Sequence, residues 1–114
     1  MKLSKESQMI KGHMDLLILA AIYHHGASHG YRIRQVLTDL SGRTVHPSYG
    51  QLYPHLAEME RIGWLKSRIE TIGERRERKA YTLTAAGRNE LKQRIHIWNS
   101  FSEGIARILH DIRP

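Results

Sequence analysis

A short helix followed directly by a two-stranded hairpin is the feature that most constrains the fold of this chain. Ser48 with Gln51 three residues later is a capping-box signature, which predicts that a helix begins there. Apolar and polar residues then alternate in residues 65–69 and in residues 80–83, which is typical of strands. The turn between them reads GERRER (residues 73–78). Any fold for this chain must therefore carry an arginine-tipped hairpin beside a helix.

Three helices are expected to build the body of the domain. Residues 12–25 are apolar almost throughout, which suits a helix buried on most sides, and Gly26 is expected to end it. The helix that begins near Ser48 should continue to Ile62. Another helix is predicted over residues 29–40, because its apolar residues recur at helical spacing. These residues are Ile33, Val36, Leu37 and Leu40.

Two other segments and one proline complete the body. Residues 1–11 are mostly polar, so we expect a flexible arm or a lead-in helix. Residues 44–46 are expected to form a short strand. Pro54 falls inside a predicted helix, where it cannot donate to the carbonyl four residues back and its ring crowds that residue. That residue is Gly50, whose missing side chain makes the distortion easier to absorb.

The last predicted helix is too long for a body of this size to cover. Thr84 is expected to cap it, and residues 85–112 would extend roughly 40 Å. Its apolar residues recur at intervals of four and three, a heptad pattern interrupted by Ser102. We therefore predict a homodimer, although a bend at Gly87 or Gly104 would let the stripe fold back onto its own domain. The predicted interface residues are Leu91, Ile95, Trp98, Phe101, Ile105, Leu109 and Ile112.

Composition limits the domain count and the classes of partner. The chain has 114 residues, so we expect one domain over residues 1–84 with an appended dimerisation helix over residues 85–114. Its formal net charge of +7 favours polyanions, with nucleic acid or an anionic membrane surface as the leading classes. The chain contains no Cys, which fits a cytoplasmic protein and excludes thiolate chemistry. The apolar run of residues 14–23 is too short to span a membrane, so no membrane partner is expected.

The hairpin and the preceding helix are predicted to contact double-stranded DNA. A helix N-terminus offers backbone donors to phosphates, and a Gln side chain can pair with adenine. The candidate contacts on the helix are Ser48, Tyr49, Gln51 and Tyr53. Alternatively, Ser48 and Gln51 serve the cap and the tyrosines pack, in which case readout falls to Tyr49 and Tyr53. Arg75 and Arg76 at the hairpin tip are predicted phosphate or minor-groove anchors, and His55 is a candidate groove contact.

The expected fold class is mainly α with a small β-hairpin wing (α+β), a winged helix-turn-helix with a long C-terminal dimerisation helix. Over residues 11–112 the chain resembles the PadR family of bacterial winged-helix transcription regulators. The strings that carry the resemblance are MDLLIL (residues 14–19), HGYRI (29–33), SYGQLYP (48–54) and GERRERKAYTLTAAG (73–87). Within these strings Tyr31 and Lys79 are further predicted DNA contacts, although Lys79, like Lys66 and Arg68, is also explained as a solubilising charge on a strand.

The resemblance implies a ligand-responsive repressor that dimerises through its C-terminal helix and binds an inverted-repeat operator. In multidrug-sensing relatives a tryptophan of this helix stacks on flat ligands, and Trp98 sits at the matching position. A small aromatic effector would then occupy a pocket formed by Trp98, Phe101 and Ser102, unless these residues are simply dimer core. The chain departs from the family pattern at Glu74 and Glu77, which interrupt the glycine pair and the basic run of the wing.

Other classes of function are less well matched. A winged-helix adaptor that binds proteins rather than DNA is the main alternative, but it would not require Arg75, Arg76 or the positive net charge. An enzyme is not expected, because the sequence pattern does not bring a nucleophile, a base and an orienting carboxylate together. No cofactor and no metal site are expected. His25 and His29 are four residues apart, but Gly26 should end the helix between them.

Overall fold

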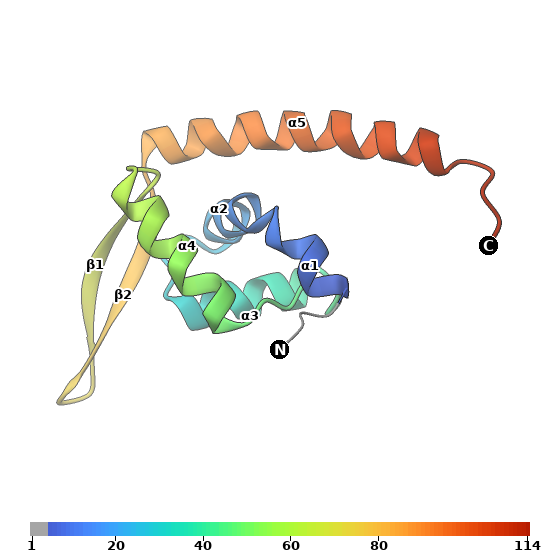
Figure 1. The fold of residues 1–114 in the computed structure, drawn as a ribbon. Coiled ribbons are helices and arrows are strands. Elements are labelled where there is room, and N and C mark those ends of the chain that lie inside the picture. The colour runs from blue at the N-terminus through green and yellow to red at the C-terminus, as the bar shows by residue number, and fades with distance from the viewer. Residues whose placement is uncertain (1–4) are drawn as a thin grey trace.

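The computed structural model describes residues 5–114, which form helices, one β-hairpin and a long C-terminal helix (Figure 1). The helices are α1 (Lys5–Lys11), α2 (Met14–His25), α3 (Gly30–Leu40), α4 (Tyr49–Arg61) and α5 (Ala85–Leu109), and the strands are β1 (Leu65–Ile72) and β2 (Arg76–Leu83). The predicted fold class, mainly α with a small β-hairpin, is confirmed. Residues 5–11 form the lead-in helix, while the arm expected for residues 1–4 lies outside the described residues.

Helix α2 forms the centre of the core, as its nearly continuous apolar sequence predicts. It packs against α3, α4, α5 and β2. Its fully buried residues are Met14, Ile18, Leu19, Ala21 and Ile22. Gly26 follows the helix with a φ of 87°, a backbone conformation that glycine adopts without strain, so the predicted end of the helix is confirmed.

Helix α3 buries Ile33 and Leu37, but Leu40 in its last turn is 63% exposed, so its predicted burial is wrong. The strand expected at residues 44–46 is also absent from the described chain. In place of strand pairing, side chains from α3 and from the residue after it form hydrogen bonds with the backbone of residues 45–47. Ser41 Oγ accepts from the backbone N–H of Val45 at 2.8 Å, and Arg34 Nε donates to the Pro47 carbonyl at 2.7 Å.

Helix α4 begins with the predicted capping box. Ser48 Oγ accepts from the backbone N–H of Gln51 at 3.1 Å, and Gln51 Oε1 accepts from the backbone N–H of Ser48 at 3.0 Å. Pro54 lies inside the helix on its exposed side. The apolar stripe of the helix, Leu52, Leu56 and Met59, faces the core. This stripe fixes which residues of α4 are left on the outer surface.

The hairpin packs on the body only near its base. Its antiparallel register pairs Leu65 with Leu83 at the base and Ile72 with Arg76 at the tip. Ala80 and Tyr81 are buried, and Tyr81 exchanges two backbone hydrogen bonds with Ser28. The two predicted strands are confirmed, but Ile69 is 64% exposed although the alternation places it on the same face as the buried Leu65. The hairpin extends away from the core by that point, and its contact with α4 there is the ion pair between Lys79 and Glu60 rather than apolar packing.

Helix α5 is anchored at its beginning and exposed for most of its length (Figure 1). Thr84 Oγ1 accepts from the backbone N–H of Gly87 at 3.0 Å, so the predicted cap is confirmed. Leu91 is the last of its residues to be buried. The helix runs unbroken from Ala85 to Leu109, and its large apolar residues beyond Leu91 are each at least 37% exposed in the single chain. The alternative that the whole stripe folds back onto its own domain is therefore not supported.

The helix also ends earlier than predicted. Its last residue is Leu109, because His110 adopts an extended backbone conformation and Asp111 has a φ of 64°. Ile112, the last position of the predicted heptad pattern, therefore lies beyond the helix and is 62% exposed. In the part of the chain that the structure describes, none of the helices combines the length and apolar character needed to cross a membrane.

Candidate nucleic-acid interface

Two tyrosines occupy the outer face of the first turns of α4. Tyr49 is 36% exposed and Tyr53 is 49% exposed, with their ring centroids 5.9 Å apart. The guanidinium of Arg34, on α3, lies 4.9 Å from the centroid of the Tyr49 ring. Burial of the opposite stripe against α2 sets this orientation. The beginning of α4 thus carries two partly exposed tyrosine rings, with the half-buried guanidinium of Arg34 beside one of them.

Ser48 and Gln51 lie at the same end of the helix, but their side chains are engaged in the capping box. Each side chain accepts from the backbone N–H of the other residue. The Gln51 amide nitrogen, Nε2, is buried and has no hydrogen-bond partner within the described residues. An amide whose oxygen is held and whose nitrogen is buried is poorly placed to pair with a base edge. The geometry therefore favours readout by Tyr49 and Tyr53.

A cleft of about 500 Å³ lies between Tyr53 of α4 and the wing. Its lining comes from three elements, namely the beginning of α3, helix α4 and strand β2. The lining residues are His29, Gly30, Tyr31, Tyr53, Glu77, Arg78, Lys79 and Tyr81. The structure thus brings together Tyr31, Tyr53 and Lys79, three of the predicted DNA contacts. Arg78 and His29 also line the cleft, and neither was among the predicted contacts.

The wall of the cleft at α3 depends on a glycine. A Cβ at Gly30 would lie 2.7 Å from the Tyr53 hydroxyl oxygen, so the ring of Tyr53 can lie against α3 only because residue 30 has no side chain. The next residue, Tyr31, is 57% exposed, and its ring stacks on that of His29 with a centroid distance of 6.1 Å. The glycine of the HGYRI string, Gly30, is therefore explained by the space that the Tyr53 ring occupies.

His29 caps α3 at the edge of this cleft. Its Nδ1 accepts from the backbone N–H of Arg32 at 3.3 Å, which leaves the proton of the neutral ring on Nε2. Burial lowers the pKa of His29, and the nearby positive charges of Arg78 and Arg32 lower it further. The neutral form that accepts this hydrogen bond is therefore favoured. The sequence signal for this role was the position of His29 directly before the helix.

Some basic side chains of the wing form ion pairs with carboxylates, and others do not. Lys79 Nζ lies 3.3 Å from Glu60 Oε1 of α4, and Arg78 Nε lies 3.4 Å from Glu70 Oε2 across the hairpin. The pKa of Glu60 is lowered by a hydrogen bond from Ser67 and, to a lesser extent, by Lys79. In contrast, the exposed Arg75 and Arg76 at the tip form no ion pair within residues 5–114. The charges of Arg75 and Arg76 are therefore less neutralised by carboxylates than those of Arg78 and Lys79.

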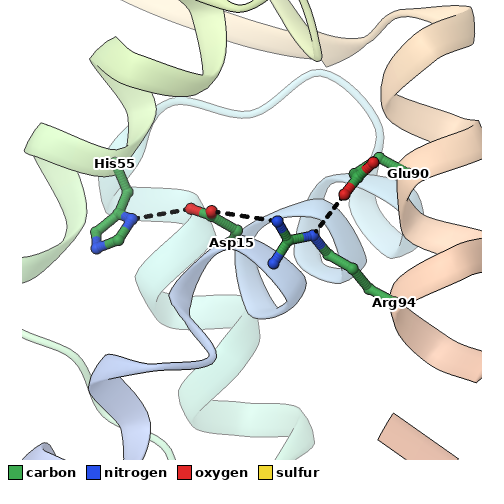
Figure 2. A network of polar contacts seen from close by, with 4 residues as sticks. All are labelled: Asp15, His55, Glu90 and Arg94. Carbon is green, nitrogen blue, oxygen red and sulfur yellow. Dashed lines mark hydrogen bonds and ion pairs between the residues drawn. The ribbon is translucent and has the colours of Figure 1, made fainter. Parts of the chain in front are cut away.

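His55 does not face the tyrosine side of α4. Its Nδ1 donates to Asp15 Oδ1 of α2 at 2.8 Å, and the same carboxylate is close to Arg94 of α5 (Figure 2). The interpretation of His55 as a groove contact is therefore not supported by its position. Its helical position relative to Leu52 and Leu56 would have indicated that it flanks the buried stripe.

The predicted interface residues of α5 form an exposed stripe. Ile95, Trp98, Phe101, Ile105 and Leu109 are each between 37% and 57% exposed, and only Leu91 is buried in its own domain. Large apolar side chains gathered on one face of a helix are typical of a surface that another protein covers.

The predicted ligand pocket is only partly assembled in one chain. The Trp98 ring lies 4.9 Å from that of His13, in an edge-on arrangement, and 6.3 Å from that of Phe101. Both Trp98 and Phe101 line a cavity of about 330 Å³ between α2 and α5. Ser102 does not line it, and its hydroxyl donates to the Asn99 carbonyl at 3.2 Å.

The histidines and acidic residues form no metal site in the described part of the chain. No three of them are grouped closely enough to hold a metal ion. His25 Nδ1 lies instead 3.0 Å from Ser28 Oγ, while His29 caps α3.

Comparison with known proteins gives a consistent result. Residues 18–93 match the sequence profile described as the transcriptional regulator PadR-like family. A transcriptional regulator from Clostridium thermocellum is 26% identical, with 93% of this chain and 97% of that chain covered and a TM-score of 0.78. A PadR-like transcriptional regulator from Bacillus cereus is 25% identical, with 93% and all of the respective chains covered and a TM-score of 0.75. None of the curated proteins matches the chain significantly in sequence.

Proposed function

The chain belongs to the PadR-like family of transcriptional regulators, and from that premise we propose that it is a repressor that binds an inverted-repeat operator as a homodimer. The observation that carries the proposal is the cleft between α4 and the wing. Tyr31 and Tyr53 line it from α3 and α4, Arg78 and Lys79 line it from the wing together with Glu77, and Arg75 and Arg76 continue the wing beyond it. Hydroxyl donors opposite cations suit a phosphate backbone.

In the proposed complex α4 is the reading helix. Its first turn would enter the major groove with Tyr49 and Tyr53, while Ser48 and Gln51 hold that turn in shape and offer at most backbone contacts. Arg75 and Arg76 would reach phosphates or the minor groove beside it. The DNA contacts we propose are thus Tyr31, Tyr49, Tyr53, Arg75, Arg76 and Lys79, with Ser48 and Gln51 supporting them.

The exposed stripe of α5 supports the proposed homodimer. Burying one large apolar side chain contributes about 1.5–3 kcal/mol, so several of them on one face favour association with a second copy. Two copies related by a twofold axis would address half-sites about 34 Å apart, one turn of the double helix. The proposed interface includes Ile112, which would have to contact the partner from outside the helix.

The proposal is tested by selecting bound fragments from the source genome, sequencing them, and measuring affinity for the recovered site at several salt concentrations. If each protomer neutralises three or four phosphates, the logarithm of affinity should fall against the logarithm of salt with a slope of about −5 to −7. A slope near −2, or binding to no fragment at all, would contradict the proposal and favour a protein-binding adaptor.

A variant that combines Arg75→Ala with Arg76→Ala tests the wing separately. Four lost contacts in the dimer should reduce the magnitude of the slope by about 3.6, because each neutralised phosphate contributes about 0.9. The matched control combines Lys92→Ala with Arg107→Ala, which removes the same charge from exposed positions on α5. An equal change in the two variants would show that only the net charge matters.

We propose in addition that a small aromatic effector binds beside Trp98 and Phe101, with Ser102 contributing only if the dimer changes its surroundings. Planar aromatic compounds should quench the fluorescence of Trp98, and this quenching should be absent in Trp98→Ala. Trp64, the other tryptophan of the chain, remains in that variant as an internal reference. Equal quenching in both proteins would place the effect outside this pocket.

A further inference from the structure

One carboxylate on α2 connects the reading helix with the C-terminal helix (Figure 2). Asp15 Oδ1 accepts from His55 Nδ1 of α4 at 2.8 Å. Asp15 Oδ2 lies 3.6 Å from Arg94 Nη2 of α5. Arg94 Nε in turn donates to Glu90 Oε1, one turn earlier in α5, at 3.0 Å. The two helices that the proposed function uses most are thus held on the same side chain.

This network is neither fully buried nor freely solvated. The side chains of Asp15 and Arg94 are 27% and 30% exposed, and those of His55 and Glu90 are 36% and 24% exposed. Charges in such partly screened positions interact more strongly than surface ion pairs, whose net contribution is small. The network can therefore influence the relative placement of the helices.

His55 is attached to the back of the reading helix. At about 100° per residue, its side chain lies roughly 140° around the helix from the direction midway between Tyr49 and Tyr53. A displacement of His55 toward or away from α2 must therefore turn or tilt the face that carries the two tyrosines.

Arg94 is a second point at which α5 is held. The first point is the beginning of the helix, where Gly87 lies against the carbonyl of Trp64. Arg94 follows seven residues later, about 10 Å along the axis, and its guanidinium lies 5.0 Å from the centroid of the Trp64 ring. Two fixed points determine the direction of a helix, and the proposed dimer face lies beyond the second from Ile95 onward.

We infer that Asp15 is a positioning residue for operator recognition, because it holds His55 of α4 and Arg94 of α5 on one carboxylate and so sets the angle between these helices. In a dimer joined by α5, this angle determines the distance between the two reading helices and hence the half-site spacing that the protein accepts. The inference rests on the proposed function.

The test uses the operator recovered from the genome and derivatives with one or two base pairs added to or removed from its centre. Wild-type protein should prefer the natural spacing. Asp15→Asn keeps the size of the side chain but removes the charge that serves both partners. We expect it to lower the preference for the natural spacing about 5- to 10-fold, the range of a modest coupling between sites, while affinity for the altered spacings stays near that of the wild type.

Asp39→Asn is the matched control, because it raises the net charge by the same amount at an exposed position on α3. Its spacing preference should equal that of the wild type. An Asp15→Asn protein with wild-type preference, or with equal losses at every spacing, would overturn the inference. A wild-type protein that binds but ignores spacing would also overturn it, whereas one that binds no DNA would refute the proposed function itself.

A second variant guards against a loss of folding in Asp15→Asn, which circular dichroism would reveal. Arg94→Met removes the guanidinium from the other side of the contact and keeps an apolar stem against Trp64. It should lower the spacing preference to a similar degree, and the double variant should lose no more than either single one, because both changes break the same connection. Fully additive losses would count against a shared connection.

Discussion

The first ten residues of α5 and the remaining fifteen share one apolar stripe, which begins at Leu91, but they have opposite surroundings. In the first part, Gly87 and Leu91 are buried against the body. In the second part, Ile97, Phe101 and Ile108 are each more than half exposed. Periodicity therefore identifies an apolar face without saying what covers it. The body covers the first part, whereas we propose that a second copy covers the rest.

The largest effect on stability is expected at Gly87, where the backbone of α5 contacts the backbone of Trp64. A Cβ at Gly87 would lie 2.1 Å from the carbonyl oxygen of Trp64, and backbone atoms cannot move aside as a flexible side chain can. Gly87→Ala should therefore lower the free energy of unfolding by about 3 kcal/mol, measured by urea denaturation.

Gly104→Ala is the corresponding change in the exposed part, where a Cβ would meet nothing within 4 Å. Since alanine favours a helix over glycine, it should raise the free energy of unfolding by about 0.5–1 kcal/mol. Losses of similar size in both variants would remove the distinction between the two parts of the helix.

A smaller but still large effect is expected on association. Ile105→Glu places a carboxylate in the exposed stripe, where burial in a dimer would strip its water. The dissociation constant of the dimer, measured by analytical ultracentrifugation, should rise about 100-fold, which is about 2.7 kcal/mol. The exposed Gln93→Glu adds the same charge outside the stripe and should leave it unchanged. A monomeric wild type at micromolar concentration would contradict the proposed dimer.

The smallest effect is expected when a residue that flanks either end of α5 is replaced by alanine and the losses in stability are compared. Thr84 Oγ1 accepts from the N–H of Gly87 and donates to the Gly63 carbonyl at 2.6 Å, so Thr84→Ala should cost about 1 kcal/mol in thermal unfolding. His110 at the other end is exposed and, among the described residues, its side chain pairs only with exposed Asp111, so His110→Ala should cost almost nothing. Equal costs would mean that the exposed end is held more firmly than its contacts indicate.

Local signals in the sequence predicted much of the fold. The capping box at Ser48, the glycine after α2 and the threonine before α5 each act through neighbouring backbone groups, so they can be recognised without knowing the tertiary structure. Two unexpectedly exposed residues have a common cause. Leu40 and Ile69 are apolar at the expected spacing but lie where the body ends, and only the tertiary structure determines that limit.

The candidate site was predicted less completely than the fold. Tyr31, Tyr53 and Lys79 come from three elements, and their meeting in one cleft depends on packing that involves the missing side chain of Gly30. The position of His55 depends on Asp15, which is 40 residues away in the chain. Helical spacing indicates that His55 flanks the buried stripe of α4, but it does not identify a partner so distant in the chain, and so it did not exclude the interpretation as a groove contact.

The outer rungs of the hairpin, Glu70 with Arg78, Thr71 with Glu77 and Ile72 with Arg76, contain no buried residue. Insertion of two residues into each strand would therefore lengthen the arm by about 7 Å and keep each tip side chain on its original face, without repacking the interior. Insertions and deletions at these rungs can thus change the length of the arm without disturbing the core of the domain.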